Sequence, residues 1–208
     1  LIRAVLEIST LVETNCKIKL EYISIGGGYG IPYKDEDPIL DIDRVFKNIG
    51  KEFYSVYNEG ECPVFCIEPG KYLVGDAGIL LARVTGVKES YKNFIGLDAG
   101  METLMRPVLY GAYHRIYKVG EPEAATDMTA DITGRICENT DRLAVDRPFP
   151  IVTEDDLVAI MDTGAYGYSM AHQFNTRPRP AEVLLESNTA SLIRKRETVE
   201  DIFKGCDV

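Results

Sequence analysis

The hydrophobic positions of the first 70 residues alternate between helical spacing and short apolar runs. Residues 1–16 and 38–58 repeat apolar side chains at helical spacing, which predicts two amphipathic helices. The runs 19–25 and 64–67 are rich in β-branched and aromatic residues and predict strands, the second of them buried as in a parallel sheet. The order helix, strand, helix, strand is typical of the tail of an alternating β/α domain.

Capping residues set the expected ends of these helices. Asp37 directly precedes Pro38 and is the expected N-cap of the helix over 38–58, and Gly60 is expected to close that helix. The first helix has no such cap, because the chain opens at Leu1, inside an apolar helical pattern and without Met. A trimmed N-terminus would explain this start, and so would a longer polypeptide of which a substantial part lies upstream.

After Gly70 the pattern changes to a succession of strands with little helix between them. Turn signals rich in Gly, Pro and Asp, among them 146–148, separate the apolar segments, and residues 198–204 are expected to form a short closing helix. This pattern predicts an antiparallel β-barrel or sandwich. The expected fold is therefore α/β plus β, with the β/α part over residues 1–70 and a β-rich domain over residues 71–208. The expected strands are 79–88, 93–98, 113–119, 128–137, 157–162, 181–186 and 191–196.

Composition and charge narrow the range of partners. The chain has 208 residues with 33 acidic and 23 basic side chains, and its formal net charge is -10. Nucleic acid and anionic membranes would repel such a chain, so neither is an expected partner. No run approaches the roughly 18 apolar residues of a membrane span, and residues 1–13 lack the order of a signal peptide. The odd number of cysteines, five, indicates reduced thiols in a cytoplasmic protein.

Two glycine-containing loops follow the two strands expected in the first part. Residues 26–28 are consecutive glycines, whose amides could cradle a phosphate because no side chain stands in the way. A tight turn that needs positive φ would leave the same signature. In the segment Glu68-Pro69-Gly70-Lys71, Gly70 offers another unobstructed amide and Lys71 adds a positive charge. A turn at a domain junction is the alternative for this second loop.

Three groups of polar residues in the second part are further candidates. Arg106 and Tyr110 could grip a carboxylate together, or be a surface Arg and a half-buried Tyr. Cys137 is expected at the end of a strand beside Glu138, whose charge should keep the thiol protonated and suit it to acid catalysis. An inert buried Cys is the commoner outcome. Tyr166 is either presented by flanking glycines on a tight turn or packed in a hairpin.

The histidines and cysteines form no metal-ligand pattern. His114 and His172 are far apart in the sequence and are expected to be structural or surface residues. Cys62 and Cys66 are four residues apart, but no second Cys or His pair completes a zinc site. No metal is therefore expected.

In this order and spacing, the motifs resemble the C-terminal half of a diaminopimelate decarboxylase, a pyridoxal-phosphate enzyme of the alanine-racemase-like barrel class. The resemblance covers nearly all of residues 18–205, and the block around Arg106, Cys137 and 177–180 favours this branch over ornithine and arginine decarboxylases. It implies the tail of a (β/α)8 barrel that binds pyridoxal 5'-phosphate, followed by a β-rich domain that completes the active site. The matching stretches are 25–33 (IGGGYGIPY), 68–71 (EPGK), 97–110 (LDAGMETLMRPVLY), 134–141 (GRICENTD) and 162–183 (DTGAYGYSMAHQFNTRPRPAEV).

The resemblance also implies a role for each motif. The residues implied to bind the cofactor are Gly28, Glu68, Pro69, Gly70, Lys71 and Tyr166. Those implied to bind an amino-acid substrate are Lys71, Arg106 and Tyr110, at its carboxylate, and Glu138, at its distal ammonium. Cys137 is implied to be the catalytic proton donor. In the family, the Cys and Glu at these two positions reach into the active site of the other subunit, which implies a homodimer with shared sites.

The chain departs from the family pattern in two respects. The family's cofactor-binding Lys and the His that stacks on the cofactor have no counterpart here and are expected upstream of Leu1. The family usually has Arg where Lys71 stands, which loosens the bidentate grip expected there. The implied reaction is decarboxylation of meso-diaminopimelate to L-lysine, in lysine biosynthesis. The 208 residues alone are expected to be inactive.

Two alternatives remain open at the level of sequence. One is another amino-acid decarboxylase of the same family, acting on ornithine, arginine or carboxynorspermidine. The choice among these substrates would depend on Arg106 and Glu138, which are implied to contact the distal end of the substrate. The other alternative is a non-catalytic binding or assembly module.

Overall fold

The computed structural model describes residues 1–58 and 60–207, and the chain divides into two compact units, 1–73 and 74–208. Residue 208, the end of the expected second domain, lies outside the described residues. The boundary between the units falls within the short helix α3 (Gly70–Val74). The assignment of residues 1–70 to a cofactor-binding barrel stays a prediction.

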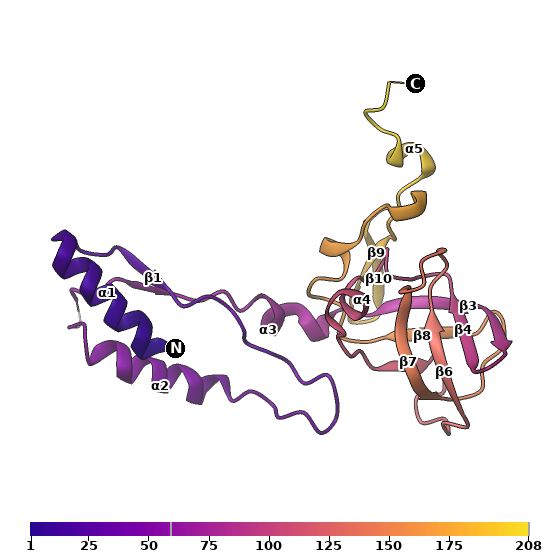
Figure 1. The fold of residues 1–208 in the computed structure, drawn as a ribbon, viewed down its shortest axis with the longest axis horizontal. Coiled ribbons are helices and arrows are strands. Elements are labelled where there is room, and N and C mark those ends of the chain that lie inside the picture. Colours follow the sequence, from indigo (N-terminus) through magenta and orange to yellow (C-terminus); the bar gives the residue numbers. More distant parts are fainter. Residues whose placement is uncertain (59, 208) are drawn as a thin grey trace. The chain divides into compact units, whose positions relative to one another are not determined.

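The first unit combines two helices with a two-stranded parallel sheet (Figure 1). Ile23 of β1 lies opposite Phe65 of β2, which confirms the expected parallel pairing. The small core is formed by Leu6, Ile23 and Phe53, because the apolar stripes of both helices meet the strands there. The elements are α1 (Ile2–Cys16), β1 (Tyr22–Ser24), α2 (Ile42–Tyr54) and β2 (Val64–Cys66), in the order that the sequence predicts.

The expected cap and end of α2 are both wrong. The N-cap is Asp41, whose carboxylate accepts the backbone N–H of Arg44 at 2.9 Å. The side chain of Asp37 instead accepts two backbone N–H groups of the preceding turn, so it caps that turn and not the helix. The helix ends at Tyr54, well before Gly60.

The burial expected for the strand over 64–67 is also wrong at its first residue. Val64 is 65% exposed, although β2 does pair in parallel. In a two-stranded sheet each strand keeps one unpaired edge, so its side chains are covered less than in the middle of a wide parallel sheet.

The second unit is a mostly-β domain built on a six-stranded sheet that curls into a half-barrel (Figure 1). Across the sheet the order is β5, β8, β3, β4, β6, β7, and the described neighbours are antiparallel except for β4 and β6. Its inner face is a continuous apolar core in which Val84, Ile95 and Ile132 are fully buried. The strands are β3 (Leu80–Glu89), β4 (Asn93–Leu97), β5 (Ile116–Lys118), β6 (Met128–Thr133), β7 (Arg142–Phe149) and β8 (Leu157–Ile160).

The turn expected at 146–148 is wrong, because these residues lie within β7. Arg147 pairs with Ala130 of β6, and Asp146 has a φ of 46° where the register of the two strands shifts. The turn signals therefore mark a bulge inside a strand and not its end. Pro148 is tolerated because β7 lies at the edge of the sheet, where a missing N–H breaks fewer ladder bonds.

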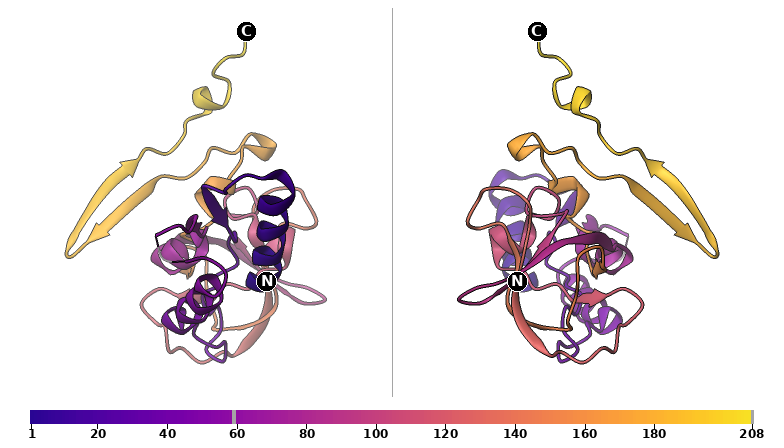
Figure 2. Two further views of the ribbon diagram at one scale, coloured as in Figure 1. Left: turned by 90° about the vertical axis from the view of Figure 1, so that its left-hand side faces the viewer. Right: turned by 90° about the vertical axis from the view of Figure 1, so that its right-hand side faces the viewer.

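The last part of the chain is a hairpin and a short helix. The strands β9 (Glu182–Glu186) and β10 (Thr189–Arg194) form an antiparallel hairpin that stands apart from the six-stranded sheet (Figure 2). The closing helix is confirmed but is shorter than expected, as α5 (Val199–Ile202) with a capping box between Thr198 and Asp201. Across the two described ranges, no helix is long and apolar enough to cross a bilayer.

An ion pair closes the base of this hairpin. The guanidinium of Arg179 bonds the carboxylate of Glu197, the backbone N–H of Arg179 donates to the same carboxylate at 2.9 Å, and Gln173 Nε2 donates to it at 2.9 Å. These hydrogen bonds, that of Arg179 first, lower the pKa of Glu197 from 4.5 to about 2.

Glu197→Gln should lower the free energy of unfolding by about 1 kcal/mol at pH 7, because it removes the anion that Arg179 binds. Since the pKa of Glu197 is lower in the folded chain than in the unfolded chain, its contribution is complete above pH 4.5 and is lost as the pH falls towards 2. Urea titrations at pH 7 and pH 3.5 would measure the difference. Glu186→Gln, at the exposed end of the same hairpin, is the matched control, and a Glu197→Gln effect that is equal at both pH values would contradict the assignment.

Candidate active site

The two glycine-containing loops of the first unit follow the carboxyl ends of β1 and β2. Because these strands are parallel, both loops leave the same edge of the sheet, which is where ligands bind in α/β proteins. The backbone N–H of Glu68 donates to the carbonyl of Gly26 at 2.9 Å, and Ser24 Oγ donates to Glu68 Oε1 at 2.8 Å. A Cβ on Gly27 would lie 2.6 Å from the carbonyl oxygen of Glu68, so the two loops approach closely only because that side chain is absent.

The backbone of the first loop fits a phosphate group. Gly28 has a φ of 94°, and a Cβ there would have no atom within 4 Å, so the space beside this amide is open. Consecutive amides without side chains form the kind of nest that binds phosphate oxygens. The second loop runs through Pro69 into α3, where Lys71 Nζ lies 5.8 Å from the centroid of the Tyr33 ring. The residues present in this unit therefore fit a phosphate-bearing cofactor.

In the second unit, Arg106 begins the short helix α4 (Arg106–Tyr110) and is buried, unlike a surface Arg. Its Nη1 lies 3.0 Å from Nε2 of the fully buried His114, whose Nδ1 lies 2.8 Å from the carbonyl oxygen of Met161. A carbonyl can only accept, so Nδ1 carries the proton and Nε2 accepts from Arg106. Burial lowers the pKa of His114, which favours this neutral form. Tyr110, one turn after Arg106, is exposed.

The motif that contains Tyr166 is a tightly held loop after β8. Asp162 is buried and accepts Arg115 Nη2 at 3.0 and 3.1 Å, and the backbone N–H of Gly164 donates to the carbonyl of Gly75 at 3.0 Å. Tyr166 itself has a φ of 60° and is half exposed. A non-glycine residue in this region of φ is uncommon, so Tyr166 is held there at some cost in backbone strain.

Cys137 and Glu138 lie in the loop 134–141 between β6 and β7, and not at the end of a strand as expected, because β6 ends at Thr133. Both are exposed, so Cys137 is not an inert buried thiol. Asn175 Nδ2 lies 3.5 Å from Cys137 Sγ, and the carboxylate of Glu138 accepts the backbone N–H and the hydroxyl of Thr140 at 3.2 and 3.1 Å.

Buried acids that the sequence reasoning missed connect these loops. The carboxylate of Asp141 accepts the backbone N–H of Met101 at 2.7 Å, and Glu102 Oε1 accepts Arg135 Nε at 2.9 Å. The carbonyl of Glu102 also accepts the N–H of His172 at 2.9 Å. Asp141 and Glu102 lie within the stretches that carry the family resemblance. Their position in those stretches is the sequence feature that could have identified them as candidates.

Three motif stretches of the second unit, 97–110, 134–141 and 162–183, are thus bonded to one another. Within them lie the expected site residues Arg106, Tyr110, Cys137, Glu138 and Tyr166. The other expected residues, Gly28 and Glu68 to Lys71, belong to the first unit. His114, expected to be structural or at the surface, is confirmed as a buried structural residue, and it supports Arg106.

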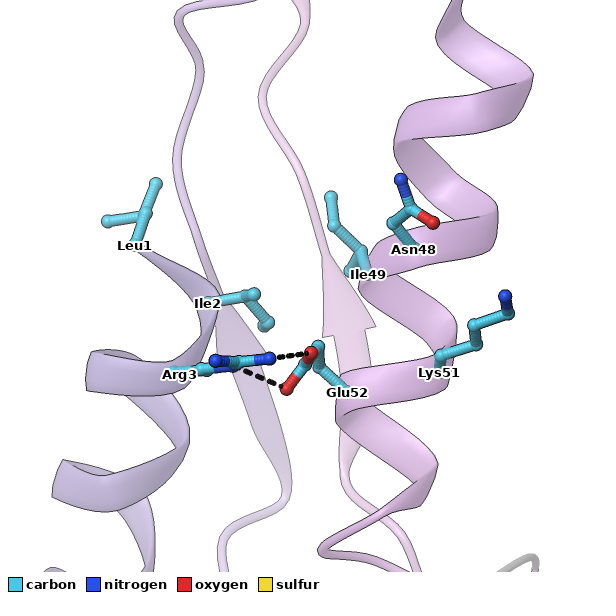
Figure 3. Close-up of a pocket in the computed structure, with 7 residues that line it drawn as sticks. All are labelled: Leu1, Ile2, Arg3, Asn48, Ile49, Lys51 and Glu52. Atoms are coloured by element: carbon cyan, nitrogen blue, oxygen red, sulfur yellow. Dashed lines mark hydrogen bonds and ion pairs between the residues drawn. The ribbon is translucent and has the colours of Figure 1, made fainter.

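Two pockets of the structure contain none of the expected site residues. One, of about 400 Å³, lies between the start of α1 and α2 and is crossed by the ion pair of Arg3 and Glu52 (Figure 3). The other, of about 420 Å³, lies over β3 and β4 and includes Tyr91 and Phe94. Over residues 1–58 and 60–207, no group of three or more His, Cys, Asp and Glu side chains is placed to hold a metal ion.

The fold and these loops match a known class of enzyme domain. A family model for the pyridoxal-dependent decarboxylase C-terminal sheet domain matches residues 30–164. The chain therefore belongs to the family of pyridoxal-dependent decarboxylases, of which it carries the C-terminal sheet domain. Within that family it is homologous to diaminopimelate decarboxylase, over the C-terminal half of that enzyme.

Individual relatives support this placement. Diaminopimelate decarboxylase of Methanothermobacter thermautotrophicus is 43% identical over 210 residues, which cover 100% of this chain and 49% of that protein. A crystal structure of diaminopimelate decarboxylase from M. jannaschii matches 100% of this chain and 47% of its own, with a TM-score of 0.88 and 34% identity. A structure of the same enzyme with L-lysine has a TM-score of 0.85, with the same identity and coverage. The chain spans about half the length of these relatives.

Gly134→Ala should destabilise the chain through one contact, because a Cβ there would overlap the carboxylate of Asp141. The φ of Gly134 is outside the left-handed region, so lack of space is the obstacle. Overpacking of this kind costs about 1–3 kcal/mol in the free energy of unfolding. In a chain that already carries Asp141→Ala, the same substitution should cost much less. Urea titrations of the four proteins in this double-mutant cycle would measure the coupling, and strictly additive effects would contradict the contact.

Proposed function

We propose that this chain is the C-terminal half of a cytoplasmic pyridoxal-phosphate enzyme that decarboxylates meso-diaminopimelate to L-lysine and CO2. The observation that carries the proposal is the homology to diaminopimelate decarboxylase along the whole chain. The complex of the M. jannaschii enzyme with L-lysine supports it, since lysine is the product of the proposed reaction. Residues 1–70 would be the end of the cofactor-binding (β/α)8 barrel, and residues 71–208 the domain that completes the active site.

Pyridoxal 5'-phosphate, when bound, supplies an electron sink for the charge left at Cα as CO2 departs. The chain's own contribution would be to hold its phosphate. The open amide of Gly28 and the segment from Glu68 to Lys71 would bind it at the carboxyl ends of the parallel strands, and the hydroxyl of Tyr166 would donate a further hydrogen bond. The lysine that carries the cofactor would lie in the part of the relatives that this chain does not span.

The substrate would be held at charged groups of opposite sign. Lys71, Arg106 and Tyr110 would bind carboxylate, and Glu138 would accept hydrogen bonds from the distal ammonium. His114 orients the guanidinium of Arg106 without adding charge, because its imidazole is neutral. These contacts would fix the substrate so that the bond to be broken faces the cofactor.

Cys137 would be the acid that protonates Cα after CO2 has left. A thiol carries a proton that it can donate to a carbanion, which is the step a general acid performs. Both side chains are exposed on the loop 134–141, as residues that serve a neighbouring subunit must be. We therefore include in the proposal a homodimer in which this loop enters the partner's active site.

The substrate can be tested in the complete gene product that contains this chain. Wild type should prefer meso-diaminopimelate to lysine and ornithine by orders of magnitude, because a substrate without the distal carboxylate lacks the group that the cationic side chains of the proposed site would bind. Arg106→Ala should narrow that preference. Glu138→Gln should lower kcat/KM for all three diamino acids, because each presents a distal ammonium. The measurement is kcat/KM for each substrate on each variant.

Glu123→Gln is the matched control for this panel, because Glu123 is exposed in a loop outside the proposed site. A wild type that prefers ornithine, or an Arg106→Ala variant with an unchanged ratio, would overturn the choice of substrate. A complete protein that binds pyridoxal 5'-phosphate but decarboxylates no amino acid would instead favour a binding or assembly module.

The shared site can be tested by mixing two inactive proteins. Cys137→Ala should bind the cofactor normally and lose turnover by about 10²–10⁴-fold. A second variant lacks the cofactor-binding lysine. When equal amounts exchange subunits, each hybrid dimer contains one intact site, so about a quarter of wild-type activity should return. If subunits demonstrably exchange and no activity returns, Cys137 and the cofactor-binding lysine serve an active site within one subunit, and the shared site is wrong.

A further inference from the structure

The loop 134–141 is closed at its neck by its last residue. The backbone N–H of Gly134 donates to the carbonyl of Asp141 at 3.0 Å, and the N–H of Asp141 donates to the carbonyl of Glu138 at 3.0 Å. These bonds join the two ends where β6 and β7 meet, because Thr133 and Arg142 are paired residues of the two strands. Among the described residues, no backbone–backbone hydrogen bond of this kind holds the middle of the loop, which carries Cys137.

The side chain of Asp141 fills that gap. Its Oδ2 accepts the N–H of Ile136 at 3.2 Å, directly before Cys137, while Oδ1 accepts the N–H of Met101 at 2.7 Å from the segment that leads to α4. One carboxylate therefore holds both the loop of Cys137 and the segment of Arg106.

The surrounding backbone leaves room for this carboxylate and for little else. A Cβ at Gly100 would lie 2.5 Å from Asp141 Oδ1 and 2.8 Å from Glu102 Oε2, and a Cβ at Gly134 would overlap the carboxylate. Two glycines, one on each loop, thus flank Asp141, and neither has a φ in the left-handed region. Their missing side chains are explained by the space that the carboxylate occupies.

This placement has an electrostatic cost. Asp141 is 3% exposed, and burial raises its pKa. The N–H groups of Met101 and Ile136 oppose that shift, the carboxylate of Glu102 adds to it, and the guanidinium of Arg135 opposes it. Because the ionised carboxylate is less favourable here than in the unfolded chain, its charge does not stabilise the fold, and its effect is on the geometry of the loops.

We propose that Asp141 is the positioning residue that fixes Cys137 and Glu138 for the decarboxylation and sets their register with Arg106. The inference rests on the proposed function. The carboxylate of Asp141 would touch neither substrate nor cofactor, and it would act through Cys137 and Glu138. An eight-residue loop that lacks this internal anchor samples more conformations, and a displacement of about 1 Å at a reacting group can cost about 10²-fold in rate.

Asp141→Asn in the complete protein tests the role with the least change in shape. An amide has one acceptor oxygen, so either Met101 or Ile136 loses its hydrogen bond and faces an NH2 group. We expect kcat/KM for meso-diaminopimelate to fall about 10²-fold while the affinity for pyridoxal 5'-phosphate is unchanged. Asp127→Asn, at an exposed acid in another loop, should leave both values unchanged.

A double-mutant cycle separates positioning from general damage to the fold. In a protein that already carries Cys137→Ala and Glu138→Gln, neither the thiol nor the carboxylate that Asp141 is proposed to position is present. The loss caused by Asp141→Asn should then shrink from about 10²-fold to a few-fold. An equal loss in both backgrounds, or no loss in either, would overturn the proposal.

Hydrogen exchange gives a readout that does not depend on activity. Asp141→Asn should raise deuterium uptake in residues 134–141 and at Met101, and leave uptake in β3 unchanged. Gly134→Ala, which displaces the carboxylate without removing it, should also raise uptake in this loop, so the result does not depend on one variant alone. If the wild-type protein fails to decarboxylate diaminopimelate, the proposed function is wrong. If uptake in the loop does not change, the role of Asp141 is wrong, whatever the reaction proves to be.

Discussion

The parallel pairing of β4 with β6 is the constraint on which the second unit depends. A tight hairpin can join antiparallel strands, but parallel neighbours require a long crossover. Here the crossover is residues 98–127, which carry Gly100, Met101, α4 and β5 between the two strands. The same pairing places the end of β6, and hence the loop 134–141, beside the start of that crossover. Segments far apart in the sequence therefore meet at one end of the sheet.

Buried polar groups turn this meeting into a defined arrangement. Asp141 joins the crossover to the loop 134–141, and Glu102 joins it to Arg135 and to the backbone of His172. His114 links Arg106 to the strand end at Met161. Charged groups out of contact with water are costly unless they are paired or hydrogen-bonded, so each such contact has few alternatives. Cys137 and Glu138, by contrast, are exposed.

The first unit contributes a different kind of chemistry. Its two loops offer backbone amides at the carboxyl edge of a parallel pair, where Gly27 allows the close approach of Glu68 and Gly28 leaves open space. The family to which the chain belongs uses a phosphate-bearing cofactor, and this edge has the donors that such a group needs. Backbone donors of this kind suit phosphate, whereas the second unit carries charged side chains of both signs, among them Arg106 and Glu138.

The sequence by itself determined most of the elements and the motif positions, because local spacing fixes which segments form helices and strands. It also indicated Cys137, Glu138 and Arg106, since their residue types and order carry the family resemblance. Only the tertiary structure decided the bulge in β7, the cap at Asp41, the support of Arg106 by His114 and the role of Asp141. These features depend on which distant groups a side chain or strand meets in the folded chain. The place of Asp141 also depends on the space left by Gly100 and Gly134. Local spacing along the sequence encodes neither.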